Sequence, residues 1–494
     1  MLVCWKICCG KLQQRWILAF MGCLAAMNAF MMRSCLSVAI TEMVAKSDSS
    51  NDTSSDDTCP AFESTSSNST TGGTYEWSEY TQGLILSSFF WGYMVAQIPG
   101  GITVAKFGGK YPLGIGLLLA GVLTLLTPTV VEAYGAKGLI VLRILMGLSG
   151  GAIYPSFSFL TGHWAPPNER SKIGNLIMSG AMLGTIVANA LSGVLIENSS
   201  IGWPIVFYFF GGFSVLWFCA WTLLCYSRPE MHPFITDEEK KYLEETINEV
   251  NTGKHGRKQP IPWRCILSSP PFWALIAASL SHDWGSYVMI TNLPKYMSSV
   301  LKFSVQSNGL LSALPFMAKW VVSNASSWLA DWLITGKKIS RRNARKTFTS
   351  IGGLGTAFFL IAASYAGCNR TVVVVLFIFG MGVMGNLFPG VMVNNVDLSP
   401  NHAETLMGIT NTITSLASIA APYAVGVLTP NQFLSEWRIV FWITFALFFT
   451  TTTIFDFWGD GEVQPWNDLE SIDREQKEVG SEKRKYEERM SSSE

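Results

Sequence analysis

Two arginines lie inside stretches of this chain that are otherwise apolar. Arg33 interrupts an uncharged run from Ile17 to Thr41, and Arg143 lies near the start of a later apolar run. A charge at depth in a bilayer costs about 2.5–3.5 kcal/mol even on the most lenient scale, so such residues usually face a cavity or a partner. Because guanidinium groups match the oxygens of carboxylate and phosphate, the two arginines indicate an anion-binding site.

Counting the helical rise places both arginines at similar depths. At about 1.5 Å per residue, Arg33 lies about 13 Å from Glu42, and Arg143 lies about 9 Å from Lys137 on the same side of the membrane. Neither run contains an obvious buried acid, so the two guanidiniums would repel each other unless an anion joins them. The alternative interpretation is that both arginines donate to backbone carbonyls or helix ends and stabilise the bundle.

A second group of ionisable residues lies in the other half of the chain. His282 and Asp283 are adjacent within an apolar run, and Lys319 interrupts the next one. Because imidazole titrates near physiological pH, the His282–Asp283 pair could carry protons. The alternative is that both residues face the outer wall or a water-filled vestibule. Lys319 is either a third cation at the cavity or the partner of Asp283.

Several membrane crossings are needed to position these residues. Of the 494 residues, 49% are hydrophobic and 14% are charged, whereas soluble domains average about 25% charged residues. A helix of about 20 apolar residues spans a bilayer, and the chain has twelve such segments. They are expected to begin near Ile17, Thr81, Pro112, Leu139, Ile173, Pro204, Phe272, Gly309, Thr347, Thr371, Thr405 and Arg438. We therefore predict an all-α membrane protein with twelve transmembrane helices.

Some function classes can be excluded on the same basis. The net charge is zero, which argues against nucleic-acid binding. The sequence contains no Walker, zinc or catalytic-triad spacing. We therefore expect neither an enzyme nor an ATP-driven pump, and we expect no metal and no resident cofactor.

Charges in the connectors orient the predicted helices. Lys and Arg concentrate before the first span and after the second, fourth and eighth, whereas the connector 46–77 is acidic. Since positive charge marks the cytoplasmic side, both termini are predicted to be cytoplasmic. The opposite side holds the glycosylation acceptor sites Asn51, Asn68 and Asn198. It also holds Cys59 and Cys368, which could form a disulfide in an oxidising compartment.

The longest charged connector divides six spans from six. We predict a cytoplasmic N-terminus, an N-terminal six-helix half, a cytoplasmic linker, a C-terminal six-helix half and a cytoplasmic tail, at residues 1–15, 16–226, 227–270, 271–458 and 459–494. Within the linker, Ile235–Val250 has an amphipathic helical pattern that Thr236 is predicted to cap. The tail alternates acidic and basic residues and is predicted to be solvated or disordered.

Short motifs recur six helices apart. The segment from Pro99 to Lys110 follows the second span, and Ser326–Asp331 with its basic continuation follows the eighth. Two parallel halves with a site between them are the plan of major facilitator transporters. Lys106 and Asp331, in the repeated connectors, are predicted to brace helix ends across the halves in one conformation and to release them in the other.

Six segments make the chain similar to a known family. They are Arg33-Ser-Cys-Leu-Ser-Val-Ala39, Ser88-Phe-Phe-Trp-Gly-Tyr93, Gln97-Ile-Pro-Gly-Gly101, Arg143-Ile-Leu-Met-Gly147, Trp164-Ala-Pro-Pro-Asn-Glu-Arg-Ser171 and Gly408-Ile-Thr-Asn-Thr412. With these motifs the chain resembles the anion–cation symporter family of the major facilitator superfamily. That family includes sialin, the vesicular glutamate transporters, the type I sodium–phosphate cotransporters and insect proteins described as inorganic phosphate cotransporters.

The resemblance implies a substrate cavity around the two arginines. It places Arg33 and Arg143 there, with Tyr93, Tyr154 and Tyr287 around them. These five residues are the predicted substrate-binding set.

The sequence departs from the family pattern at two positions that matter for coupling. The acid that family members are thought to use for proton coupling is Gly150 here, and the histidine that often follows is Ser158. His282, Asp283 and Lys319 are therefore the candidates for coupling transport to an ion.

Together these features predict a secondary active transporter. We expect symport of a small anion, inorganic phosphate or an organic carboxylate, by alternating access, driven by sodium, protons or the membrane potential. The alternatives are a carrier of organic anions such as sialate, urate or glutamate, and a membrane sensor without transport, which Gly150 favours. We expect a monomer whose partners are the anion and the lipid bilayer. Neither tail contains an acidic dileucine signal, which favours the plasma membrane over lysosomal or vesicle membranes.

Overall fold

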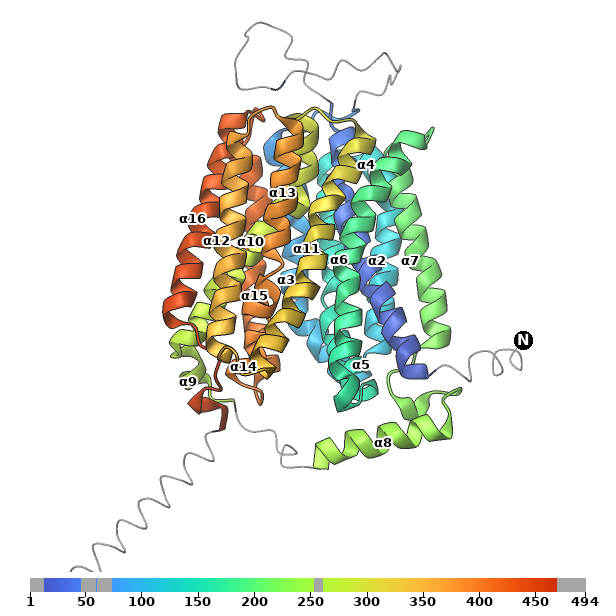
Figure 1. The fold of residues 1–494 in the computed structure, drawn as a ribbon. Helices are drawn as coiled ribbons and strands as arrows, with labels where there is room; N and C mark the ends of the chain where they lie inside the picture. The colour runs from blue at the N-terminus through green and yellow to red at the C-terminus, as the bar shows by residue number, and fades with distance from the viewer. Residues whose placement is uncertain (1–12, 46–58, 60–72, 253–260, 469–494) are drawn as a thin grey trace, which may run out of the picture.

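The computed structural model describes residues 13–45, 59, 73–252 and 261–468, and these residues form a helical bundle. Most helices run along one common axis, and one linker helix lies across the end of the bundle (Figure 1). Asn51 and Asn68 fall outside the described residues. The predicted fold class, an all-α membrane protein, is confirmed.

The N-terminal half of the bundle runs from α2 to α7. Its helices are α2 (Gln14–Met43), α3 (Glu79–Phe107), α4 (Lys110–Gly150), α5 (Ile153–Trp164), α6 (Pro167–Asn198) and α7 (Pro204–Leu224). The linker contains a short turn of 3-10 helix, η1 (Pro229–Met231), and then α8 (Asp237–Thr252) and α9 (Trp263–Leu267).

The C-terminal half runs from α10 to α16. Its elements are α10 (Pro270–Ser299), α11 (Val305–Thr335), α12 (Arg341–Tyr365), α13 (Arg370–Met384), the π-helical turn η2 (Phe388–Met392), α14 (Asn394–Leu398), α15 (Ala403–Leu428) and α16 (Leu434–Trp458). A last 3-10 turn, η3 (Pro465–Asp468), follows. Each half buries its own hydrophobic core.

The elements account for the twelve predicted crossings. Gly135 has φ 60° and ψ −143°, which bends α4 into two crossings, the second of which continues into α5. The helices start within about six residues of the predicted positions, which is typical of boundaries inferred from hydropathy. Eight segments of the described chain are long and apolar enough to cross a membrane, and 110–164 is one of them. The helices α10 and α11 carry charged residues within the span, and α3 carries Gln, Ser, Gly and Pro residues in its interior, so these three helices are not among the eight.

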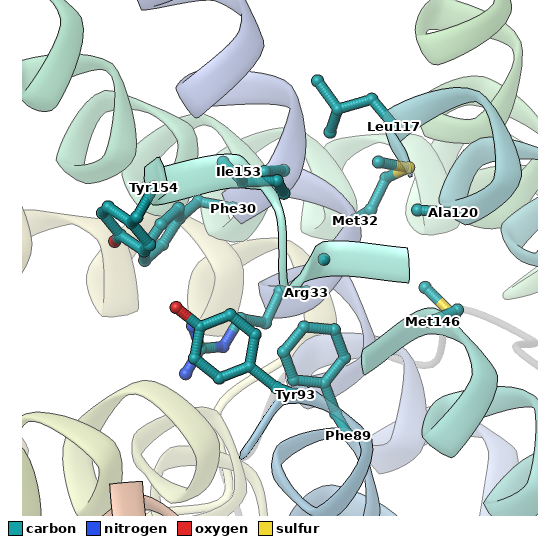
Figure 2. Close-up of a pocket in the computed structure, with 12 residues that line it drawn as sticks. Phe30, Met32, Arg33, Phe89, Tyr93, Leu117, Ala120, Met146, Ile153 and Tyr154 are labelled. Atoms are coloured by element: carbon teal, nitrogen blue, oxygen red, sulfur yellow. The ribbon is translucent and has the colours of Figure 1, made fainter. Parts of the chain in front are cut away.

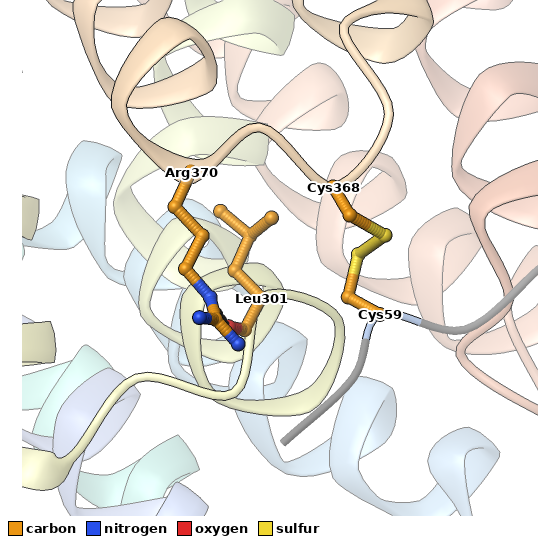
Figure 3. Close-up of a disulfide and its surroundings, with 4 residues drawn as sticks. All are labelled: Cys59, Leu301, Cys368 and Arg370. Atoms are coloured by element: carbon orange, nitrogen blue, oxygen red, sulfur yellow. Dashed lines mark hydrogen bonds between the residues drawn. A yellow bond between two sulfur atoms is a disulfide. The ribbon is translucent and has the colours of Figure 1, made fainter. Parts of the chain in front are cut away.

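The two ends of the bundle differ. One end carries α8 and the first and last described residues, and we call it the α8 face (Figure 1). The other end carries a disulfide between Cys59 and Cys368, whose Cα atoms are 5.3 Å apart, and we call it the disulfide face. Beside the disulfide, the Arg370 side chain donates to the carbonyl of Leu301 at 2.8 Å (Figure 3). The disulfide joins the connector after α2 to the connector after α12, so it links the two halves covalently.

The linker helix is fastened to the N-terminal half by one glutamate. The hydroxyl of Thr236 accepts the backbone N–H of Glu239 at 3.3 Å, which confirms the predicted cap of α8. The Glu239 carboxylate in turn accepts the backbone N–H of Gln14 at 2.9 Å and approaches the Arg15 guanidinium at 3.4 Å. Because the first N–H groups of a helix lack internal partners, Glu239 caps α2 from a helix more than 220 residues away.

The tail prediction is wrong for residues 459–468. Trp466 in η3 is buried, and the backbone N–H of Gln464 donates to the carbonyl of Leu398 at 2.9 Å. The side chain of Asn467 accepts the Ser399 hydroxyl at 2.7 Å. The alternating charges predicted a solvated segment. Trp466 nevertheless provides enough apolar surface for residues 459–468 to dock on the bundle. The rest of the tail lies outside the described residues.

Candidate functional site

Arg33 extends from α2 into an aromatic enclosure. Its guanidinium carbon lies 5.3 Å from the ring centre of Phe30, 5.1 Å from Phe89, 4.2 Å from Phe90 and 4.6 Å from Tyr287. The first three rings belong to the N-terminal half, whereas Tyr287 belongs to α10 in the C-terminal half. The faces of aromatic rings attract cations, so the rings hold the charge in place without neutralising it.

Arg143 lies at the same level, as predicted from the helical rise. Its Nη2 donates to the backbone carbonyl of Arg33 at 3.2 Å, and its guanidinium lies 5.2 Å from the ring centre of Phe89. The alternative interpretation, bonding to a backbone carbonyl, therefore applies to one nitrogen of Arg143. Nε of Arg143 and Nη2 of Arg33 are buried and have no hydrogen-bond partner among the described residues. These two buried nitrogens thus remain available to a ligand.

Arg33 borders a small cavity that Tyr93 and Tyr154 separate from a large one. Side chains of α2, α3, α4 and α5 surround the small cavity (Figure 2), which measures about 30 Å³. That is room for about two water molecules. Tyr93 and Tyr154 also line a vestibule of about 1010 Å³, which extends along the half of α3 nearer the α8 face. A small-molecule ligand can occupy a vestibule of about 1010 Å³. The side chains of Tyr93 and Tyr154 line both spaces and lie between this vestibule and Arg33.

The other vestibule walls come from both halves. Gln97 on α3 donates to the Ser415 hydroxyl on α15 at 3.2 Å and accepts from the Thr412 hydroxyl at 3.5 Å. Gln97, Ser158 and His163 face the vestibule from the N-terminal half, and Asn411 and Thr412 face it from the C-terminal half. Gly150 lines the small cavity, and a Cβ there would lie 3.6 Å from the Tyr93 ring, at ordinary van der Waals distance. A side chain at this position would point toward the site.

The ionisable residues of the C-terminal half form one hydrogen-bonded group. Nδ1 of His282 lies 3.1 Å from the Asp283 carboxylate, and its Nε2 lies 3.3 Å from Nζ of Lys319. Lys319 also donates to the Ser286 hydroxyl at 2.9 Å. Lys319 lines neither cavity, and it has no direct ion pair with Asp283, because His282 lies between them and contacts both.

At the disulfide face the two halves are in close contact. Lys295 on α10 forms a buried ion pair with Glu79 at the start of α3, and Gln432 donates to the same carboxylate at 3.0 Å. Below the pair, a Cβ on Gly83 of α3 would lie 2.9 Å from the carbonyl oxygen of Pro422 on α15. On the opposite side, a Cβ on Gly309 of α11 would lie 2.6 Å from the carbonyl oxygen of Asn189 on α6. The site is therefore closed toward the disulfide face and faces the vestibule.

The two predicted gating residues lie far from such contacts. Lys106 and Asp331 are exposed at the α8 face, and neither forms an ion pair with a described residue. Their bracing role therefore stays a prediction for the opposite conformation. The acceptor residue Asn198 is exposed at the end of α6, on the disulfide face.

Sequence reasoning missed the contacts that close the disulfide face. Lys295 interrupts an apolar run in the same way as Lys319 does, and that signal could have singled it out. Glu79 offers no comparable signal, because an acid at the start of a helix is common.

Comparison with known proteins decides the family. Residues 22–422 and 333–475 match the model of the Major Facilitator Superfamily. The chain belongs to the major facilitator superfamily. Within it, relatives named as a phosphate cotransporter, sialin and a vesicular glutamate transporter place the chain in the anion–cation symporter family, as a multi-pass membrane transporter rather than an enzyme.

Relatives of this family cover most of the chain. A Drosophila melanogaster protein named "Putative inorganic phosphate cotransporter" is 39% identical over 474 residues, 94% of this chain and 88% of the relative. Human sialin is 37% identical and covers 93% of this chain and 91% of its own length. Vesicular glutamate transporter 1 of Xenopus tropicalis is 34% identical and covers 94% and 78%.

Solved structures share the fold of this superfamily member. The inward-facing, unoccupied crystal structure of a bacterial homologue of the human lysosomal transporter Spinster has a TM-score of 0.68 at 14% identity, covering 90% of this chain and 97% of that one. The partially occluded, inward-open xylose transporter XylE from E. coli has a TM-score of 0.65 at 14% identity, covering 90% and 98%.

Proposed function

We propose that this transporter carries a small anion, inorganic phosphate or an organic carboxylate, between Arg33 and Arg143. The observation that supports this proposal most directly is a difference in the partners of the buried Lys and Arg side chains. Arg15, Lys295 and Arg345 each pair with a carboxylate, and the buried Lys110 and Lys319 donate to the Thr222 carbonyl and the Ser286 hydroxyl. In contrast, the described residues give neither Arg33 nor Arg143 an ion-pair partner, and each arginine has a buried nitrogen without an acceptor among them.

The lack of an internal carboxylate favours a ligand from outside. A buried charge is costly unless it is paired and hydrogen-bonded, and the aromatic rings around Arg33 supply only part of that compensation. An anion between the two guanidiniums would accept from Nη2 of Arg33 and Nε of Arg143, which are buried and have no acceptor among the described residues. The printed names of the relatives, which refer to phosphate cotransport, sialin and glutamate transport, support the same ligand class.

The anion would reach the arginines from the vestibule. Tyr93 and Tyr154 separate the vestibule from the small cavity beside Arg33, so their rings must turn or shift to admit it. In the opposite conformation the contacts at Glu79, Gly83 and Gly309 would open and the vestibule would close. Alternating access of this kind exposes the site to one side at a time.

The α8 face is the cytoplasmic side in this proposal, and the plasma membrane is the proposed location. The basic connectors lie on the α8 face, as the positive-inside rule requires, and the disulfide lies on the face that would meet an oxidising compartment. Epitope tags on both termini should become accessible to antibodies only after cells are permeabilised. Glycosidase treatment should lower the apparent mass of the protein unless Asn51, Asn68 and Asn198 are all replaced.

The decisive experiment is transport by purified protein in liposomes. Labelled phosphate, urate, sialate and glutamate are tested separately, with sodium, pH and membrane potential imposed one at a time, against liposomes without protein. We expect saturable uptake of at least one of the four, and competition by its unlabelled form. Absence of uptake of every anion under every gradient would contradict the proposal.

A sensor without transport is the second candidate, and Gly150 is the observation that favours it. The family's acid is absent there, although the cavity has room for a side chain. If the wild type is silent in the liposome assay while Gly150→Glu gains pH-dependent flux, the sensor is the better description.

A further inference from the structure

Asp283, His282 and Lys319 form a hydrogen-bonded chain whose protonation state can be assigned. Lys319 is an ammonium with three donors and no acceptor, so Nε2 of His282 must offer its lone pair to Nζ at 3.3 Å. Nδ1 of His282 then carries the ring proton and donates it to the Asp283 carboxylate at 3.1 Å. Asp283 is thus negative, His282 neutral and Lys319 positive, and the group as a whole is neutral.

The two ends of this chain face different surroundings. The Lys319 side chain is buried against α10, where it also donates to Ser286 at 2.9 Å. The Asp283 side chain is 25% exposed. Asp283 lies one helical turn from Tyr287, so the two share a face of α10, and the ring of Tyr287 lies 4.6 Å from the Arg33 guanidinium. Asp283 is therefore the open end of the chain and is directed toward the arginine site.

The charged and titratable groups around Asp283 come from five helices. From the N-terminal half these are Arg33 on α2, Tyr93 on α3, Arg143 on α4 and Tyr154 on α5, and both tyrosines have Arg33 and Asp283 among their electrostatic neighbours. From the C-terminal half, α11 contributes Lys319. Of the other helices packed on α10, α15 carries only Tyr423 between Met407 and Leu428, and α16 carries no charged or titratable residue between Val440 and Phe455. The charged residues of α12 and α14 lie near the α8 face, where Arg345 pairs with Asp397.

Its charge makes Asp283 an internal competitor of the transported anion. An ionised Asp283 lies within range of the same positive field that would hold the anion, and two negative charges at one site repel each other. A proton on Asp283 removes that repulsion and gives the whole group one added positive charge. By linkage, the proton strengthens anion binding by the same factor as the anion strengthens proton binding.

We propose that Asp283 is the carboxylate on which this transporter carries its co-transported proton, and that His282 and Lys319 are positioning residues that fix it. The inference rests on the proposed anion transport and names its coupling ion. One proton passes from water in the vestibule to a carboxylate oxygen of Asp283, forming an O–H bond. After the change of conformation the same proton leaves to water on the other side, and no bond of the anion is broken.

The test is Asp283→Asn, which has the same shape as the protonated acid and no charge. Its amide oxygen can still accept Nδ1–H of His282, so the hydrogen-bonded chain is kept. With liposomes preloaded with sialate, whose carboxylate stays ionised from acidic to neutral pH, we expect the variant to exchange labelled sialate at a rate close to that of the wild type. Uptake driven by a pH gradient should fall by about tenfold or more, which is within the usual range of coupling between two ligands.

A pH-sensitive dye inside the liposomes provides the second readout. Proton movement should accompany anion uptake in the wild type and in Asp283→Glu, which keeps the carboxylate, but not in Asp283→Asn. Glu245→Gln, which neutralises an exposed carboxylate on α8, is the matched control and should behave as the wild type. The same assays are run with phosphate as a second probe.

Three results would overturn the inference while the proposed anion transport stands. The first is proton-driven accumulation retained by Asp283→Asn. The second is loss of exchange together with accumulation in that variant, which would make Asp283 a substrate ligand. The third is wild-type uptake that follows a sodium gradient without proton movement. Failure of the wild type to carry any of the four labelled anions would instead remove the proposed function and this inference with it.

Discussion

In the N-terminal half, Arg33 and Arg143 lie at one level with two unused donors, whereas in the C-terminal half Lys319 is linked to Asp283 through His282. Both groups are buried at the centre of a membrane protein, where an unpaired charge is expensive. The first group lacks a counter-ion among the described residues, and the second contains one. The difference indicates that the N-terminal half depends on a ligand for charge compensation and that the C-terminal half does not.

The remaining buried cations have partners near the ends of the bundle. Lys110 donates to the carbonyl of Thr222 at 2.9 Å. Arg345 binds Asp397 at 2.6 Å and the carbonyl of Pro389 at 2.6 Å, and Lys295 pairs with Glu79. These pairs lie near the two ends of the bundle, where they hold helices together. The arginines at mid-depth are thus the exception within this chain, and changing their charge balance is the most direct way to test the comparison.

The largest effect is expected from removing either arginine. Arg33→Ala or Arg143→Ala should abolish measurable uptake, a loss of about 100-fold or more, because truncating one partner of a buried charge pair typically costs 2–5 kcal/mol. Initial uptake rates are normalised to the amount of protein at the cell surface. The anion should also raise the thermal unfolding temperature of the wild type and not that of the variants, since a ligand stabilises only a state that binds it.

Arg228→Ala is the matched control for both arginine variants. Arg228 is exposed beyond α7 at the α8 face and lines neither cavity, so its removal should leave uptake unchanged. Normal uptake by Arg33→Ala or Arg143→Ala at normal surface expression would mean that the two halves do not differ as described.

A smaller effect is expected when the N-terminal half receives its own counter-ion. Gly150→Glu would place a carboxylate in the cavity beside Arg33, where a Cβ has room. The ionised glutamate should compete with the anion and weaken its binding about tenfold at neutral pH, a typical coupling between two ligands. Protonation removes the competitor, so uptake should recover as the pH falls.

The matched control is Gly150→Gln, which fills the same space without charge. If steric hindrance alone weakens binding, both variants lose affinity equally and neither recovers at acidic pH. Recovery in the glutamate variant only would show that the missing acid, rather than the cavity shape, separates the two halves.

Much of this architecture could be predicted because the bilayer imposes simple rules on sequence. Hydropathy and connector charge were sufficient to predict twelve spans and their division into two halves. Counting 1.5 Å per residue brought Arg33 and Arg143 to one level, and the Arg143–Arg33 contact confirms it. Rigid helices of known rise make depth a predictable quantity.

Hydropathy and helical rise do not predict which side chains meet around a helix axis or between the two halves. Hydropathy does not predict that the rings of Phe30, Phe89 and Phe90 surround Arg33. Tyr287, which approaches from the other half, was expected there only from the family resemblance. Similarly, Glu239 caps α2 only because the linker folds back. Such pairings depend on the rotation of each helix and on the conformation captured, and neither is encoded in hydropathy.

A moderate effect is expected at the disulfide face, where Lys295 has its own carboxylate. Glu79→Gln or Lys295→Gln leaves one buried charge without its partner, which favours opening of this face to water. We expect uptake to change about fivefold, which is the lower end of the usual range of coupling between two sites. A cysteine replacing Gln82, which is buried beside the pair, should react faster with a membrane-impermeant maleimide in these variants.

The charge-swapped double variant, Glu79→Lys with Lys295→Glu, tests whether the pair itself matters. It should return both uptake and cysteine reactivity toward the wild-type values. If the swap behaves like the single variants, then burial or packing around Glu79, rather than its attraction to Lys295, closes this face.

The smallest effect is expected from Glu239, whose charge serves only the fold. Glu239→Gln weakens the cap on α2 and the contact with Arg15, which should lower stability by about 1 kcal/mol, in the range measured for helix caps. Thermal unfolding in detergent measures the loss. Glu245→Gln on the same helix should cost less than about 0.5 kcal/mol, because its partner Lys241 is exposed and 3.8 Å away.

Uptake should be the same in both variants once it is normalised to folded protein. Neither glutamate lines the vestibule or the small cavity, so a change in transport rate cannot come from the site itself. A variant of Glu239 that folds normally and transports poorly would therefore show that α8 takes part in the conformational change. In that case a charged residue of the linker, and not only those of the two halves, would contribute to transport.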